Sequence, residues 1–265
     1  MNLSCTKTEY EDNHACVSWR GHSFSVGSEF DGFLKGSVRS RLDDEEGSDD
    51  FRSHVRGLEL TGMGKTTLEA VLAAEAPEER DWAAGEALAE AFLMETHGIA
   101  FPWNMERDKR NPFGSLPGAD LVGFLSEGDG YRLALGEVKT SSEEAYPPQV
   151  MSGRSGHMGH QIDTLGSNLT TLCQLLKWLH PRTKGGQFED AFDRSCVAYF
   201  NSGRKAIALF GVLIRDTQPN ARDLSARGSA LRNRLAAPTQ CDLIALYLPW
   251  KSDQLIPAIR QGGDA

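Results

Sequence analysis

Two apolar runs separated by a short polar segment constrain the fold of this chain more than any other feature. The runs cover residues 120–125 and 131–139, and the segment between them, residues 126–130, contains Gly128 and Gly130. Apolar runs of this length on either side of a glycine-containing turn are typical of a β-hairpin. We therefore predict two adjacent strands near the middle of the chain.

Three chemically reactive side chains fall on this predicted hairpin. Asp120 begins the first run, and Glu137 and Lys139 lie near the end of the second. Because side chains alternate between the two faces of a strand, Glu137 and Lys139 share one face, and Val138 points into the core. Asp120 sits at the mouth of the first strand, within reach of both.

This combination of residues suits a metal-dependent phosphodiesterase. Two carboxylates, here Asp120 and Glu137, with a backbone carbonyl such as that of Val138, can hold Mg²⁺ (or Mn²⁺) so that the ion keeps waters and takes a phosphate oxygen. The bound ion offsets charge on the phosphate and lowers the pKa of an attacking water. Lys139 can orient that water or offset charge in the transition state.

The arrangement resembles the PD-(D/E)xK nuclease superfamily, which has the restriction-endonuclease-like fold. Asp120, Glu137 and Lys139 match its aspartate, its acidic position and its lysine, while Ala119 stands where the family name places proline. The resemblance implies an α/β (α+β) protein with a restriction-endonuclease-like core, in which helices flank a mixed central sheet. A solvated surface pair on a strand is the alternative interpretation of Glu137 and Lys139.

Two further positions are candidates through the same resemblance. The superfamily usually has an acid on the helix before the first core strand, and residues 81–97 are predicted to form that helix. Its Glu86 and Glu90 share a face because they lie four residues apart, and Glu86 is the candidate metal ligand, with an exposed helix acid as the alternative. Gln161 matches a glutamine on the helix after the lysine strand, but the tyrosine that often follows is replaced by Leu165.

A closer resemblance extends over most of the chain. The order of elements is similar to the HamA nuclease family of Hachiman anti-phage defence systems. In chain order these elements are an acid-bearing helix, residues 118–124, the Glu-Val-Lys strand, a glutamine on a long helix and a final strand-helix-strand-helix series. It implies a nuclease that a helicase/ATPase partner restrains and then activates on foreign or damaged DNA. A standalone DNA repair or restriction nuclease, and a catalytically silent adaptor with the same fold, are the alternatives.

The segment around Gly64, Lys65 and Thr66 resembles a phosphate-binding Walker A loop. That pattern requires a glycine five residues before Gly64, where this chain has Glu59, whose carboxylate would face the phosphates. We therefore predict that no nucleotide binds there. Thr66 or Thr67 is expected to cap a helix instead.

Charge is distributed unevenly along the chain, whose net charge is −9. Residues 1–170 contain 29 acidic and 15 basic residues, whereas residues 171–265 contain 8 acidic and 13 basic residues. Because neutralisation of phosphates dominates DNA affinity, the isolated chain is expected to bind DNA weakly and through its last third. The candidate nucleic-acid contacts there are Arg222, Arg227, Arg232 and Arg234.

Arg227 and Arg234 lie seven residues apart in a segment, residues 221–236, that is predicted to be helical. They would therefore project from one helix face. A solvated helix without a ligand is the alternative interpretation.

The organisation of the chain suggests two parts. Residues 1–64 are predicted to form an N-terminal β-containing subdomain, a candidate partner-binding region, and residues 65–265 the nuclease-like core. The acidic run at residues 43–50 is expected to be an exposed loop, and residues 161–179 a single helix. Further strands are predicted at residues 195–200, 205–214 and 242–248, and a last helix at residues 252–260.

Composition bears on location and on other classes of site. No stretch reaches the about 18 apolar residues that span a bilayer, and the N-terminus lacks the apolar region of a signal peptide, so we expect a cytoplasmic protein. The cysteines show no paired spacing, which argues against a disulfide framework and against a zinc finger. They are Cys5, Cys16, Cys173, Cys196 and Cys241.

Overall fold

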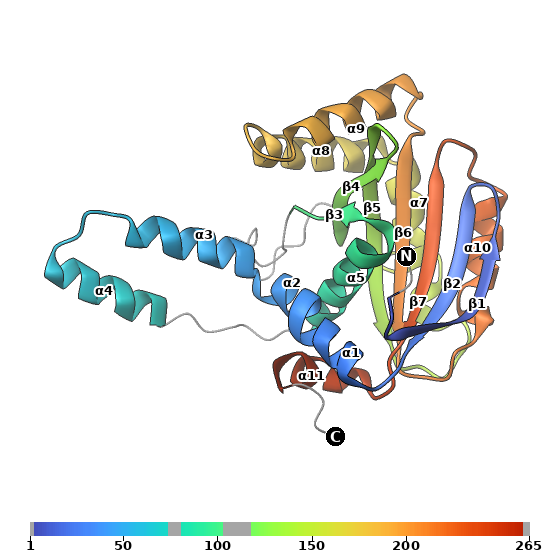
Figure 1. Ribbon diagram of the computed structural model, residues 1–265. Coiled ribbons are helices and arrows are strands. Elements are labelled where there is room, and N and C mark those ends of the chain that lie inside the picture. The colour runs from blue at the N-terminus through green and yellow to red at the C-terminus, as the bar shows by residue number, and fades with distance from the viewer. Residues whose placement is uncertain (1–2, 74–80, 103–117, 262–265) are drawn as a thin grey trace.

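The computed structural model describes residues 3–73, 81–102 and 118–261. Within these residues the chain forms a seven-stranded mixed sheet in the order β1-β2-β7-β6-β5-β4-β3, with helices packed against it (Figure 1). The strands are β1 (Thr6–Asn13), β2 (Val17–Phe24), β3 (Ile99–Ala100), β4 (Leu121–Glu127), β5 (Gly130–Ser141), β6 (Ile207–Arg215) and β7 (Gln240–Tyr247).

The centre of the sheet is parallel and its two edges are antiparallel. Strands β2, β7, β6 and β5 run parallel to their neighbours, whereas β1 pairs antiparallel with β2, and β4 pairs antiparallel with both β3 and β5. All nine residues of β6 are buried, as expected for a parallel strand covered on both faces. Strand β5 of the candidate hairpin therefore pairs with the parallel strands on one side, and β4 lies next to the edge strand β3.

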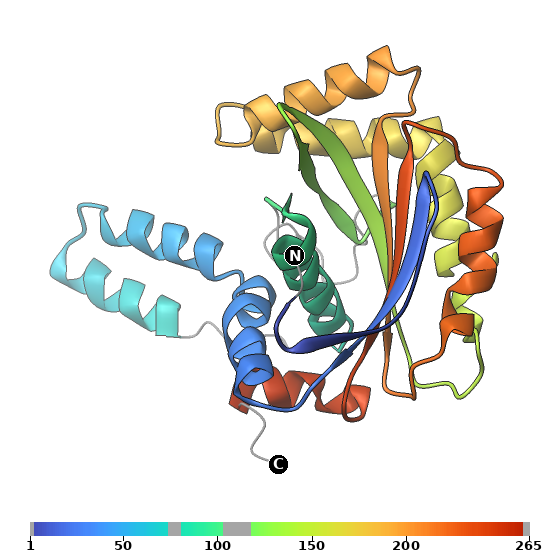
Figure 2. The same cartoon turned by 45° about the vertical axis from the view of Figure 1, so that its right-hand side comes forward.

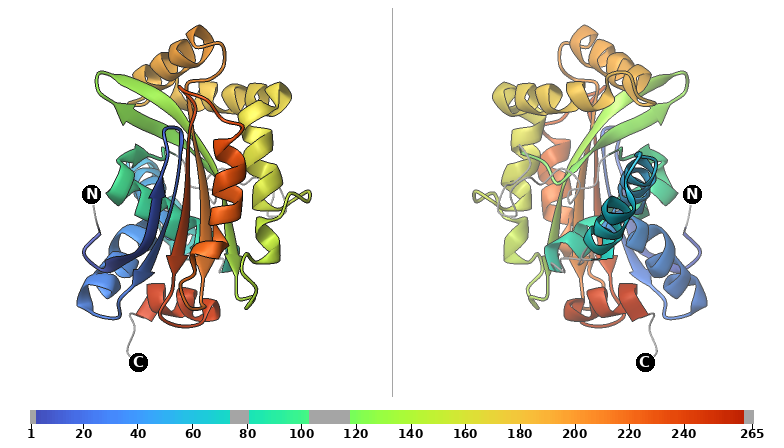
Figure 3. Two further views of the ribbon diagram at one scale, coloured as in Figure 1. Left: turned by 90° about the vertical axis from the view of Figure 1, so that its right-hand side faces the viewer. Right: turned by 90° about the vertical axis from the view of Figure 1, so that its left-hand side faces the viewer.

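Helices cover both faces of the sheet (Figure 3). One apolar core joins the sheet to helices α1, α2, α5 and α11, and a second core on the opposite face joins it to α7, α8, α9 and α10. None of the described helices is long and apolar enough to cross a bilayer. The helices are α1 (Ser28–Phe33), α2 (Arg39–Asp43), α3 (Glu45–Arg56), α4 (Gly62–Ala73), α5 (Asp81–His97), α7 (Met158–Ser167), α8 (Leu169–Thr183), α9 (Glu189–Asn201), α10 (Ser225–Arg232) and α11 (Leu255–Gln261), with short helical turns η1 (Leu34–Val38), η2 (Gln149–Met151), η3 (Ala221–Asp223) and η4 (Ser252–Gln254).

Helices α3 and α4 form an antiparallel pair that extends away from the sheet (Figures 1 and 2). We call residues 45–73 the arm. Helix α4 buries none of its side chains, and the ion pair between Arg56 and Glu69 (3.1 Å) ties it to the end of α3.

The predicted hairpin is confirmed. Strands β4 and β5 pair in a register that places Leu121 opposite Gly136, and the turn between them falls at Gly128 and Asp129. Helix α5 covers the residues predicted for it, and β6 and β7 confirm the strands predicted at residues 205–214 and 242–248. These elements carry their pattern locally, so the sequence was sufficient to find them.

The N-terminal strands belong to the same sheet as the hairpin. Strand β2 pairs with β7 in parallel, Val17 opposite Cys241 and Ser23 opposite Tyr247. Gly228 of α10 packs directly on the ring of Trp19, with no room for a β-carbon. Residues 6–24 therefore extend the central sheet and share its core.

The strand predicted at residues 195–200 is wrong, because this segment lies inside helix α9. The helix buries Phe192, Ser195 and Tyr199, which recur at helical spacing, and exposes Val197. The β-branched and aromatic residues suggested a strand, but packing of one helical face against the sheet overrides that local preference.

The acidic run at residues 43–50 is helical rather than an exposed loop. It spans the end of α2 and the start of α3, and the break between them is at Asp44, which adopts a left-handed conformation and accepts a hydrogen bond from the Gly47 N–H (3.3 Å). An aspartate at a helix N-terminus satisfies a backbone donor and interacts favourably with the helix dipole.

The helix predicted over residues 161–179 is instead two helices, α7 and α8. Asn168 separates them, and its side-chain oxygen accepts hydrogen bonds from the backbone N–H groups of Thr170 and Thr171 (2.9 and 3.1 Å). Apolar spacing continues across the junction, but the asparagine cap starts a new helix in a new direction.

The Walker A-like segment lies within α4, where Gly62, Gly64 and Lys65 are helical. Thr61, not Thr66 or Thr67, caps this helix by accepting a hydrogen bond from the Gly64 N–H (3.2 Å). The glycines that suggested a phosphate-binding loop are thus part of a regular helix.

Candidate active site

The start of β4 and the end of β5 bring Asp120 against the backbone of the second strand. The Asp120 N–H donates to the Gly136 carbonyl (3.0 Å), and its carboxylate accepts from the Val138 N–H (2.9 Å). Strand β4 begins at Leu121. Beyond this point the Asp120 side chain, instead of a β4 backbone carbonyl, accepts the hydrogen bond from the β5 backbone. This contact fixes the carboxylate beside Glu137.

Glu137 and Lys139 lie together on the face of β5 opposite Val138, as their alternation predicts. Val138 packs in the core that contains α5. Lys139 Nζ lies 2.5 Å from Glu137 Oε1. Glu137 is only 2% exposed, whereas the Lys139 side chain is 24% exposed, so the lysine is the member of the pair that solvent reaches.

The electrostatics of this group are unbalanced. Burial, and then the nearby Asp120 carboxylate, raise the pKa of Glu137 to about 7, against the opposing effect of Lys139. One ammonium group therefore faces two carboxylates in a largely buried position. An additional cation would relieve this repulsion, because opposite charge favours the ionised form of a carboxylate.

The residues present suit a divalent cation. Asp120 and Glu137 would supply carboxylate oxygens. The Val138 N–H donates a hydrogen bond to Asp120, and the Val138 carbonyl points to the same edge of β5 as this N–H. Hard oxygen ligands of this kind suit Mg²⁺ and Mn²⁺. Among the described residues, no group of three or more His, Cys, Asp or Glu side chains is placed to hold a metal ion. A metal bound here would therefore need the Val138 carbonyl in addition to Asp120 and Glu137.

Glu86 and Glu90 approach from the other face of the sheet. Helix α5 packs there, and Gly85 lies against Thr140 at the end of β5, where a β-carbon added to the glycine would lie 3.0 Å from the Thr140 hydroxyl oxygen. Glu86 is therefore near the end of the Lys139 strand, and its metal role stays a prediction. Glu90 is buried and forms an ion pair with Arg41 (2.6 Å), which ties α5 to α2.

Gln161 lies on helix α7, which covers the face of the sheet that Glu137 occupies. Gly211 is directly opposite Glu137 in the β5–β6 ladder, and Met158 packs on Gly211. The first turn of α7 thus lies beside Glu137, and Gln161 follows one turn later. It is half-buried, and its catalytic role stays a prediction.

The predicted helix over residues 221–236 is shorter than expected, because α10 ends at Arg232. Arg227 and Arg234 still converge, since both form ion pairs with Asp163 of α7 (2.5 and 2.9 Å). Arg227 also donates to the Gly159 carbonyl (2.8 Å), and its side chain is 14% exposed. It therefore fastens α10 to α7, which leaves it little surface to offer DNA.

The other two candidate arginines lie apart from this pair. Arg232 contacts the His14 ring (3.1 Å), and Arg222 lies over the Tyr146 ring, 6.0 Å from its centroid. Their contact with DNA stays a prediction.

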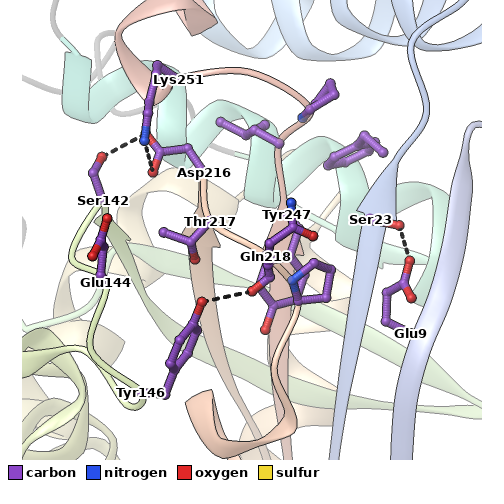
Figure 4. Close-up of a pocket in the computed structure, with 14 residues that line it drawn as sticks. Glu9, Ser23, Ser142, Glu144, Tyr146, Asp216, Thr217, Gln218, Tyr247 and Lys251 are labelled. Atoms are coloured by element: carbon purple, nitrogen blue, oxygen red, sulfur yellow. Dashed lines mark hydrogen bonds and ion pairs between the residues drawn. The ribbon is translucent and has the colours of Figure 1, made fainter.

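A polar region that no sequence pattern predicted lies at the carboxyl ends of β5, β6 and β7. A cavity of about 680 Å³ opens there, with Ser142, Asp216 and Lys251 grouped on one side and Glu9 and Ser23 on the other (Figure 4). Asp216 accepts hydrogen bonds from the Ser142 hydroxyl (2.8 Å) and the Ser252 N–H (2.9 Å). The residues that line this cavity do not include Asp120, Glu137 or Lys139.

Arg215, the last residue of β6, is fully buried and directly precedes Asp216, which lines the cavity. It donates to the carbonyls of Ser141 and Ala145 (3.0 and 3.1 Å) and pairs with Asp223 (3.4 Å). It thereby fixes the chain as it leaves β5, two residues after Lys139. An arginine at the end of an otherwise apolar run was the available signal.

Comparison with known proteins adds no assignment: no family model matches the sequence, and no curated protein matches it significantly. The functional interpretation therefore depends on the geometry of Asp120, Glu137 and Lys139.

Proposed function

We propose that this chain is a metal-dependent nuclease with a restriction-endonuclease-like core. The observation that carries the proposal is the convergence of Asp120, Glu137 and Lys139 at one point of the β4–β5 hairpin, where burial and the neighbouring Asp120 raise the pKa of Glu137. Packing alone does not require a buried glutamate beside a second carboxylate, because burial of a charged group is costly. A strongly perturbed carboxylate beside a second acid is a common property of catalytic sites.

The residues divide the chemistry between them. Asp120, Glu137 and the Val138 carbonyl would hold Mg²⁺ or Mn²⁺, which when bound would neutralise charge at the phosphate and lower the pKa of a water. Lys139, which is more exposed than Glu137, orients the attacking water and offsets the charge that develops on the phosphate oxygens. Asp120 also holds the backbone of β5 in place through the Val138 N–H.

We further propose that the chain acts on DNA as the effector subunit of an anti-phage defence complex, in which a helicase restrains and activates it. Residues 1–170 carry a net charge of −14, and repulsion from phosphates acts over a Debye length of about 8 Å at physiological salt. The arginines best placed in the sequence, Arg227 and Arg234, are paired with Asp163. A partner that holds the DNA would compensate for this acidic surface.

The nuclease assignment is tested by three substitutions and one matched control. Asp120→Asn, Glu137→Gln and Lys139→Met should each lower Mg²⁺- or Mn²⁺-dependent cleavage of plasmid DNA by at least about 100-fold. Asp129→Asn, at the turn of the same hairpin, should leave cleavage unchanged. Mn²⁺ should raise the melting temperature of the wild type but not of Asp120→Asn. Full cleavage by the Glu137→Gln protein would remove the assignment.

The partner proposal has a separate test. The isolated chain should digest duplex DNA slowly at physiological salt, and the helicase partner should accelerate it. Rapid digestion by the chain alone would favour the standalone repair or restriction nuclease. Absence of cleavage under all conditions, together with tight binding of the partner, would favour the adaptor.

A further inference from the structure

Exposed apolar side chains gather in two places on this protein. The described residues contain ten large apolar side chains with strong exposure, of which four lie in the arm and three on helices α8 and α9. Those of the arm are Phe51, Leu58, Met63 and Val71, and those of α8 and α9 are Leu169, Val197 and Phe200. Apolar surface concentrated in this way marks an interaction site rather than ordinary scatter.

The exposed side of the arm is a helical face. Met63, Thr67, Ala70 and Val71 of α4 are all exposed, and they follow one another at the i, i+4, i+7 and i+8 spacing of a single helix side. Met63 is 83% exposed and Val71 60% exposed. Within residues 3–73, 81–102 and 118–261 nothing buries this face, because α4 has no buried side chain.

Helices α8 and α9 enclose an apolar groove of about 620 Å³. Leu172, Leu176, Phe192 and Phe200 contribute to its walls. Basic side chains stand at its border, and they are Lys177, His180 and Arg204. A groove of this kind accepts the apolar face of a helix, with anchor side chains spaced by one and two helical turns.

We propose that α4 of a second copy of this chain occupies the α8–α9 groove, and that two copies exchange arms reciprocally. The chain itself carries both complementary halves: an apolar helix face in the arm and an apolar groove. The arm as a whole is also complementary in charge, because it contains six acidic and three basic residues, with four of the acids on α3, whereas Lys177 and Arg204 line the groove.

The arrangement of the two halves supports closure into a dimer. The arm and the α8–α9 pair extend toward the same side of the molecule (Figures 1 and 2). A two-fold axis on that side can place each arm on the groove of the other copy, so that every contact occurs twice. Doubling the contact brings two small apolar surfaces toward the about 1,200–2,000 Å² buried in a stable interface.

Variants that introduce a charge on each half test the exchange directly. Met63→Lys places a cation against the basic border of the groove, and Phe200→Glu places an acid in the groove wall. Each residue is strongly exposed in the protomer, so neither change should affect folding. Each variant alone should raise the dimer dissociation constant, measured by sedimentation equilibrium, at least about 10-fold.

Mixing these two variants should restore a dimer. The mixed pair contains one unaltered arm in an unaltered groove, and one lysine arm in a glutamate groove. Val26→Lys, at an exposed apolar residue outside both halves, is the control and should dimerise like the wild type. A mixture that stays as monomeric as its components would overturn reciprocal exchange.

A disulfide cross-link locates the contact. Cys173 lines the groove and is exposed, so Met63→Cys should form an intermolecular disulfide with it under mild oxidation, and Cys173→Ser should abolish that product. Peptide mapping identifies the linked residues. A wild-type chain that is monomeric at about 100 μM, well above the dissociation constant of a standard-size interface, would refute the proposal.

Discussion

Two polar clusters lie near the carboxyl end of β5, where Arg215 of β6 pairs with Ser141. They differ in how their charges are balanced. The first, the carboxylate cluster, consists of Asp120, Glu137 and Lys139. The second, the arginine cluster, consists of Arg215, Asp223 and Tyr247. Arg215 and Asp223 are both completely buried and have opposite charge, whereas the first cluster sets two acids against one base.

The surroundings of the two acids explain the contrast. Burial raises the pKa of Asp223, but the Tyr247 hydroxyl, which donates to it (2.8 Å), and Arg215 both favour its charged form. For Glu137, burial and Asp120 act in the same direction. A buried ion pair of opposite charges is a structural contact, whereas a carboxylate with a raised pKa beside a second acid is a candidate functional site.

The largest expected effect is the loss of the balanced pair. Arg215→Met should lower the free energy of unfolding by about 3–5 kcal/mol, because it leaves Asp223 charged and buried without its partner. Urea denaturation measures the change. Arg222→Met, at an exposed arginine nearby, is the control and should change stability by less than about 0.5 kcal/mol.

A second substitution separates charge from packing in the same cluster. Adding Asp223→Asn to Arg215→Met should recover part of the lost stability, because no uncompensated charge then remains. If the double variant is as unstable as the sum of the two single variants, the ion pair is not what holds this cluster.

The unbalanced cluster should respond in the opposite sense. In metal-free protein at pH 8, Glu137→Gln should raise the free energy of unfolding by about 1–3 kcal/mol, since a pKa difference of one unit corresponds to about 1.4 kcal/mol. The same substitution should abolish cleavage. Asp129→Asn is the matched control, with neither effect expected.

The pH dependence gives the sign of this effect. The folded-state pKa of Glu137 is about 7, above its ordinary value of 4.5, so the folded protein holds the proton more tightly than the unfolded chain. Metal-free wild type should therefore lose stability as pH rises from about 4.5 to 7, and Glu137→Gln should show less of this loss. Equal slopes for the two proteins would contradict the assigned pKa shift.

The sequence predicted the carboxylate cluster but not the arginine cluster, because the residues of the two clusters differ in their separation along the chain. Asp120 and Glu137 belong to one hairpin, whose register follows from a local turn. The arginine cluster joins β6, η3 and β7, and β7 in turn pairs with β2, more than 200 residues earlier in the chain. No local pattern specifies such parallel pairings.

The helices also differ in whether local sequence or tertiary packing determines them. Helix α5 shows its boundaries in the sequence, whereas α9 has the residue types of a strand and becomes helical because Phe192 and Tyr199 pack on the sheet. The break at Asn168 depends on a cap that resembles an ordinary surface residue until the neighbouring N–H groups are placed. The candidate site was predictable because its geometry is local, and the helices that surround it were not.

The smallest effect should come from Tyr10, which contacts the arginine cluster from strand β1, and it tests whether the two clusters are independent. The Tyr10 hydroxyl hydrogen-bonds the Tyr247 hydroxyl (2.9 Å), which also accepts from the Asn220 N–H (3.1 Å). Tyr10→Phe should therefore lower the free energy of unfolding by about 0.5–1.5 kcal/mol, the net value of one hydrogen bond, and leave cleavage unchanged. A stability loss of that size accompanied by a large loss of cleavage would mean that the arginine cluster positions the catalytic strand, and that the two clusters act as one unit.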